Sequence, residues 1–157
     1  MGLQRYIKNG FKGNGINVAI IDTGINYNHP DLNLSYKRGH DFVNNDEDPM
    51  DDNGHGTHCP GIIYAVDNIK GVIGVAPEAK LYSYKMLDSQ GSGYTSDLTA
   101  AIDWAIQTHN DTDTTNDIRI ISMSLGSNGN DVALENARSE ANKSGILLVS
   151  SQSLRIE

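Results

Sequence analysis

Two short motifs contain the side chains best suited to do chemistry, and the first is built around Asp22. This aspartate, with Thr23 and Gly24 after it, directly follows an aliphatic run at residues 18–21. Ligands and catalytic groups gather at the carboxyl ends of the strands in an open α/β sheet, so Asp22 is a candidate partner for an imidazole. The alternative for this motif alone is a carboxylate that caps a turn.

The second motif spans residues 54–58, Gly-His-Gly-Thr-His, and leads into a predicted helix. Histidine suits general-base chemistry because the pKa of an imidazole lies near neutrality. His55 and His58 are three residues apart, and a metal pair is therefore the alternative. The His-Glu-x-x-His spacing of zinc hydrolases and its glutamate are missing, which favours His55 as a base.

Strands must hold these motifs in place, and four segments have strand composition: residues 18–21, 81–87, 118–123 and 146–149. Most of these runs are almost continuously aliphatic. That pattern is typical of strands in a parallel sheet covered on both faces.

Helical patterns alternate with these strands. We expect three helices: one over residues 55–66, one that begins at Ser96 as its N-cap, and one over residues 131–143. Gly145 follows the third helix as a terminating residue in the left-handed conformation. Pro60 would cost about 3 kcal/mol in a helix interior, unless the first helix starts late enough to place it in the first turn. The order of elements predicts an α/β domain with a parallel sheet flanked by helices.

Composition excludes several classes of protein. The chain has 157 residues with 20 acidic and 12 basic side chains, and its net charge of −8 argues against a nucleic-acid binder. No apolar run approaches the roughly 18–20 residues that span a bilayer, so we expect no membrane protein. The first 15 residues contain no secretory signal, and the single cysteine, Cys59, allows no internal disulfide and leaves the compartment open.

Six motifs occur together in a fixed order: Val18–Gly24, His29–Leu32, Asn53–His58, Gly74–Pro77, Gly91–Gly93 and Ile121–Gly126. In order and spacing they resemble the motifs of subtilisin-like serine proteases (subtilases, peptidase family S8) over most of residues 3–149. The resemblance implies a partial subtilisin-like three-layer fold. It also implies an endopeptidase that hydrolyses peptide bonds through an Asp/His/Ser triad.

The same resemblance assigns roles to individual residues. Asp22 would orient His55 and stabilise its imidazolium, while His55 would take the proton of a serine hydroxyl. Two segments would pair with an extended peptide or protein substrate as added strands. These segments are Gly91, Ser92 and Gly93, and Ser124, Leu125 and Gly126.

A structural calcium ion is the cofactor that the resemblance implies. Its ligands would be the carboxylate of Asp31, the side-chain oxygen of Asn68, and the carbonyls of Val66, Lys70 and Val72. The family takes a further ligand from an N-terminal segment that precedes anything in this chain. The acidic stretch at residues 46–52 is either a second ion site or a solvated loop, and we favour the loop.

The family pattern is incomplete here. The Gly-Thr-Ser nucleophile motif is missing, Leu154 stands where the oxyanion asparagine is expected, and residues 150–157 depart from the family. We therefore expect residues 1–157 to be the N-terminal part of a peptidase domain, inactive alone, as after a frameshift or premature stop. The alternatives are an inactive remnant that binds a peptide or partner and a non-functional truncated product. The family favours secretion. Cys59 resembles the cysteine that lies under the catalytic histidine in the thiol-containing branch of the family, and we favour a buried, inert thiol over a reactive one.

Overall fold

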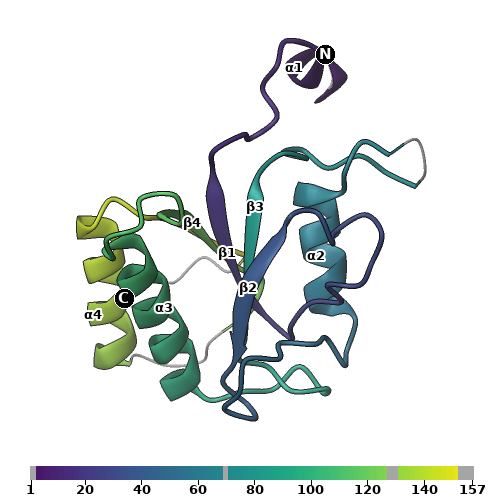
Figure 1. Cartoon of the computed structure of the whole chain (residues 1–157). Coiled ribbons are helices and arrows are strands. Elements are labelled where there is room, and N and C mark those ends of the chain that lie inside the picture. Colours follow the sequence, from purple (N-terminus) through teal and green to yellow (C-terminus); the bar gives the residue numbers. More distant parts are fainter. Residues whose placement is uncertain (1–2, 69–70, 127–130, 152–157) are drawn as a thin grey trace.

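The computed structural model describes residues 3–68, 71–126 and 131–151 and contains a parallel sheet of five strands (Figure 1). Its strand order is β2-β3-β1-β4-β5, and all its pairings are parallel. The strands are β1 (Asn17–Asp22), β2 (Tyr36–Asp41), β3 (Lys80–Lys85), β4 (Ile118–Met123) and β5 (Leu147–Ser150).

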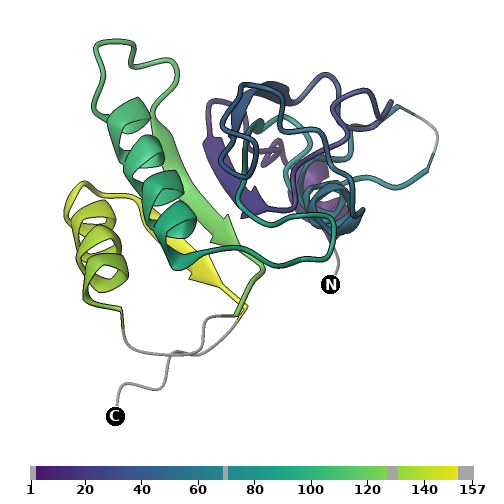
Figure 2. The same cartoon turned by 90° about the horizontal axis from the view of Figure 1, so that it is seen from below.

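Helices cover both faces of this sheet. α3 (Thr95–His109) and α4 (Val132–Lys143) lie side by side on one face, and α2 (His55–Tyr64) lies on the other (Figures 1 and 2). A short helix, α1 (Leu3–Lys8), precedes β1. The expected α/β class with a helix-flanked parallel sheet is confirmed. Within the described residues, no helix combines the length and apolar character needed to cross a bilayer.

The central strand β1 is covered on both faces, which explains why its residues 18–21 are all aliphatic. Ala19 and Ile21 belong to the core on the side of α3 and α4, while Val18 and Ile20 belong to the core on the side of α2. Successive side chains of a strand point to opposite faces, so a strand between two helical layers needs apolar residues at every position. All six residues of β1 are buried.

Two elements were not predicted from the sequence. β2 has the polar sequence YKRGHD, and it lies at the edge of the sheet with β3 as its one partner among the described strands. An edge strand can carry polar side chains, and β2 does, so it lacks the aliphatic signature used to find the others. β5, at the opposite edge, is aliphatic and was predicted from that signature. α1 has no apolar repeat long enough to indicate a helix.

Helix boundaries also differ from the prediction. α3 begins at Thr95 with Tyr94 as N-cap, so Ser96 does not cap it. α2 begins at His55, which places Pro60 in its interior, and a late start of this helix is therefore wrong. The physical reason is that the N–H groups of the first helical turn have no acceptor within the helix, and the carboxylate of Asp51 accepts one of them, from Thr57, at 2.8 Å. This contact lets the helix start at His55.

Candidate active site

The structure brings Asp22 and His55 together at the carboxyl edge of the sheet. Asp22 is the last residue of β1 and is 1% exposed, and His55 is the first residue of α2. The Nδ1 atom of His55 lies 2.7 Å and 3.0 Å from the two carboxylate oxygens of Asp22. This is the pairing that the two motifs predicted.

The contacts of Asp22 determine which nitrogen of His55 is free. A carboxylate can only accept, so Nδ1–H donates to Asp22 and the lone pair of the neutral ring lies on Nε2. The backbone N–H of Thr23 also donates to Oδ1 of Asp22, at 2.7 Å, and fixes the carboxylate. The pair can therefore take a proton at Nε2 and stabilise the resulting imidazolium.

Asp51 holds the strand and the helix in register, a role that the sequence did not suggest. Its carboxylate accepts the hydroxyl of Thr23 at 2.9 Å and both the N–H and the hydroxyl of Thr57. The N–H groups of Asn53 and Gly54 complete the set at 3.0 Å and 2.9 Å. Burial alone would raise the pKa of Asp51, but these hydrogen bonds outweigh it and hold the pKa below its ordinary value.

Lys85 is a second supporting residue that sequence reasoning missed. It is the last residue of β3, pairs with Asp22 in the sheet and is 1% exposed. In the described part of the chain, its ammonium group has three hydrogen-bond acceptors. Nζ donates to the carbonyls of Thr23 and Leu87 at 2.8 Å and 3.3 Å, and to Asp52 Oδ1 at 2.6 Å. The acidic stretch at residues 46–52 is therefore not simply a solvated loop, because Asp52 and Asp51 both hold the site together.

Cys59 lies one turn beyond His55 on α2. Its Sγ atom is 3.7 Å from Nε2 and 4.0 Å from Nδ1 of that ring, and the residue is half-buried rather than fully buried. Desolvation raises the pKa of the thiol, the hydroxyl of Ser124 opposes this by hydrogen bonding, and the charge of Asp22 adds to the increase. The thiol is therefore protonated at neutral pH.

The loop after β3 contains three predicted substrate-binding residues, Gly91, Ser92 and Gly93, all exposed. The side chain of Asn53 donates to the carbonyl of Ser89 at 2.9 Å and ties this loop to the segment before His55. A Cβ at Gly93 would lie 2.1 Å from the carbonyl oxygen of Met86, so the close approach of the two backbones requires glycine.

The other predicted substrate-binding residues, Ser124, Leu125 and Gly126, directly follow β4, and Ser124 contacts Cys59 on α2. Both segments thus lie at the sheet edge that holds Asp22 and His55. Among the described residues, no backbone–backbone hydrogen bond engages the amide or carbonyl of Gly93, Leu125 or Gly126.

The predicted calcium ligands converge only in part. Asn68 Nδ2 donates to Asp31 Oδ1 at 2.7 Å, and the N–H of Val66 donates to the Asp31 carbonyl at 3.1 Å. Val72 is 66% exposed and lines a cavity of about 490 Å³ together with Asp31. Lys70 lies outside the described residues. The carboxylate and amide are donor types that suit Ca²⁺, so calcium binding stays a prediction.

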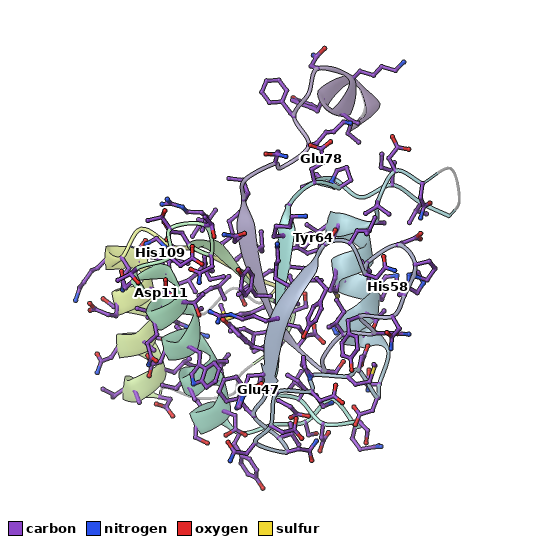
Figure 3. The ribbon with its side chains drawn as sticks, viewed as in Figure 1. Glu47, His58, Tyr64, Glu78, His109 and Asp111 are labelled. Atoms are coloured by element: carbon purple, nitrogen blue, oxygen red, sulfur yellow. The ribbon has the colours of Figure 1, made fainter. Side chains whose placement is uncertain are left out.

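His58, the other histidine of the motif, is exposed and lies on the side of α2 turned away from the sheet (Figure 3). It lines the same cavity as Asp31. In this orientation it does not join His55 in a metal pair.

Comparison with known proteins gives a consistent result. The model of the subtilase family, Peptidase_S8, matches residues 13–153. The chain is 44% identical over 146 residues to the thermostable alkaline protease of Halalkalibacterium halodurans, covering 93% of this chain and 37% of that protein. It is 43% identical over 140 residues to Subtilisin DY of Bacillus licheniformis, covering 89% of this chain and 47% of that protein. With Subtilisin Savinase of Lederbergia lenta the identity is 41% over 140 residues, covering 89% of this chain and 48% of that protein. The chain therefore spans less than half the length of each of these relatives.

Proposed function

The chain belongs to the subtilase family, and on this premise we propose that it supplies the acid–base pair and the substrate-binding edge of a serine endopeptidase. The observation that carries the proposal is the contact of 2.7 Å between His55 Nδ1 and the buried carboxylate of Asp22. A contact between two fully exposed side chains would be weak support. Here the carboxylate is buried and only the histidine is exposed, and the pair lies at the carboxyl edge of a parallel sheet, where Asp51 links its strand to its helix.

In the proposed reaction, Nε2 of His55 takes the proton of a serine hydroxyl as the oxygen attacks the peptide carbonyl. Asp22 stabilises the imidazolium, which then gives its proton to the leaving amine. Within the described residues, the ring of His55 bonds only to Asp22 and Cys59. We therefore place the nucleophile and the oxyanion donor in the part of the family domain beyond the matched segment, and expect these 157 residues alone to be inactive.

The substrate would bind as an added strand. Backbone groups of residues 91–93 and 124–126 would hydrogen-bond an extended peptide on either side of the scissile bond, and side-chain pockets would select among sequences. The exposed loop at Gly91–Gly93 supports this arrangement. So does the lack, among the residues that the structure describes, of a backbone–backbone hydrogen bond to the amide or carbonyl of Leu125 or Gly126.

A second candidate function rests on the same edge. A chain that presents these backbone groups without a nucleophile would bind peptides and not cleave them. Peptide binding by the 157-residue chain without turnover, measured with casein fragments, favours this reading over a product with no function.

The proposed endopeptidase function is tested by a chimera in which residues 13–149 replace the matching segment of Subtilisin DY, which is 43% identical. We expect the chimera to hydrolyse casein and to react with a serine-directed phosphonate. His55→Ala should reduce turnover by about a millionfold, the loss seen when the histidine of subtilisin itself is removed. His58→Ala, on the same helix, is the matched control and should retain activity. A folded chimera without turnover, or one whose turnover survives His55→Ala, would refute the proposal.

A further inference from the structure

Three side chains at the site have the composition of a metal-binding group. Asp22, His55 and Cys59 are the one set of three potential ligands, within the part of the chain that the structure describes, whose ligand atoms all lie within 4.8 Å of one another. They offer one carboxylate oxygen, one imidazole nitrogen and one sulfur. The proposed proteolytic function uses the first two and leaves the sulfur of Cys59 without a role.

This mixture of donors suits Zn²⁺. Zinc is bound by cysteine sulfur at about 2.3 Å and by histidine nitrogen or carboxylate oxygen at about 2.0–2.2 Å, often through three protein ligands and one open position. Tetrahedral ligands at these lengths are about 3.3–3.6 Å apart. Asp22 Oδ1 and His55 Nδ1, now 2.7 Å apart, would need to separate by roughly 0.6 Å, and Cys59 Sγ and His55 Nδ1, now 4.0 Å apart, to approach by about half an ångström.

The two elements that carry the ligands are already fixed against each other. His55 and Cys59 are four residues apart on α2, so both project from the same face of the helix. Asp51 ties the first turn of that helix to Thr23, the neighbour of Asp22. The side chain of His55 is 47% exposed and Cys59 is half-buried, which leaves an entry path for an ion.

We propose that Asp22, His55 and Cys59 together bind one Zn²⁺, and that the ion replaces the hydrogen bond between Asp22 and His55. The metal takes the lone pair of Nδ1, whose proton moves to Nε2 through solvent, and the thiol of Cys59 releases its proton. One proton is therefore released for each ion bound. Binding does not depend on the proposed proteolytic function, whereas the loss of a free base at Nε2 would block that function.

The test uses Co²⁺ as a spectroscopic substitute for Zn²⁺ on the 157-residue chain, so that the outcome is independent of protease activity. We expect one equivalent of Co²⁺ to give a near-ultraviolet band from thiolate-to-cobalt charge transfer, and Zn²⁺ to displace the cobalt and remove the band. Cys59→Ser should abolish the band and weaken Zn²⁺ binding at least about tenfold, since losing even an outer partner of a ligand costs that much. Cys59→Ala repeats the test without a hydroxyl, and circular dichroism checks that each variant is folded.

His58→Ala is the matched control, because this histidine lies on the same helix but on the side turned away from the sheet, where it lines the cavity that contains Asp31. It should leave the band and the affinity unchanged. Three results would overturn the proposal: no binding up to about millimolar metal, binding without a charge-transfer band, or binding that is lost in His58→Ala and kept in Cys59→Ser. The last would place the ion on a histidine pair instead.

Discussion

Replacing Asp51 by asparagine tests whether this carboxylate, and not helix propensity, places His55 against Asp22. The change preserves size and one acceptor oxygen. It turns the other oxygen into an NH₂ group that faces the donors bound there, the N–H and hydroxyl of Thr57. The helix start thus loses its external acceptor.

The magnitude follows from the bonds lost. A hydrogen bond to a charged group contributes about 1.5–3 kcal/mol, and Asp51 is only half-buried, so losing two should cost about 2–4 kcal/mol of unfolding free energy. For a domain of this size that corresponds to a fall in Tm of roughly 5–15 °C. Amide exchange at Thr57 should accelerate relative to the middle of α2.

The contribution of Asp51 to the free energy of unfolding should also depend on pH. Because the pKa of Asp51 in the folded protein lies below its ordinary value of 3.8, its stabilisation is present above that pH and is lost as pH falls through the folded value. The stability gap between wild type and Asp51→Asn, from urea unfolding, should be full at pH 7 and shrink below pH 3.8.

Asp48→Asn is the matched control, since the one side chain that donates to Asp48 in the described structure is the exposed hydroxyl of Tyr27. It should change stability by less than about 0.5 kcal/mol. If Asp51→Asn were as stable as Asp48→Asn at pH 7, or if its deficit were the same at pH 3, the proposed role of Asp51 would be wrong.

Three further predictions concern other parts of the site. Lys85→Met should cost about 3 kcal/mol in urea unfolding, because the buried carbonyls that accept from its ammonium lose their donor. Alkylation of Cys59 by iodoacetamide should be slow at pH 7, and its rate should still rise with pH above 9.0. Asp22→Asn should speed the alkylation at a given pH, because it removes a charge that raises the pKa of the thiol. A rate that levels off below pH 8 would contradict this. Millimolar calcium should raise Tm by about 1–4 °C, and Asp31→Asn should abolish the increment, whereas an unchanged Tm in the wild type would remove calcium from the account.

The sequence predicted those parts of the fold where a local pattern of residues is compatible with only one kind of secondary structure. Residues 118–123 are apolar on both faces and form β4 with the predicted bounds, and Gly145 has the expected positive φ of 85°. β2 was missed because an edge strand needs only one hydrogen-bonded partner, and β3 supplies it whatever side chains β2 carries. Pairing between strands that are distant along the chain is a tertiary effect, and a short segment of sequence does not reveal it.

The same distinction applies to the site. Asp22 and His55 were found because each is embedded in a motif with its own turn chemistry. Asp51 and Lys85 were not, because neither stands in such a motif, and each is tied to the site by a contact across the fold: Thr23 lies 28 residues from Asp51 and 62 from Lys85. In the sequence, Asp51 is one of several acids in a polar loop, and only the folded backbone distinguishes it from Asp48.

The central claim is that Asp22 and His55 form a hydrogen-bonded pair within this chain, and proton NMR of the imidazole tests it most directly. In ¹⁵N-labelled protein at low temperature, we expect one strongly downfield proton attached to Nδ1 of His55. It should be lost in Asp22→Ala and retained in His58→Ala. A folded chain without this proton, or one that keeps it after Asp22→Ala, would contradict the pairing on which the proposed function rests.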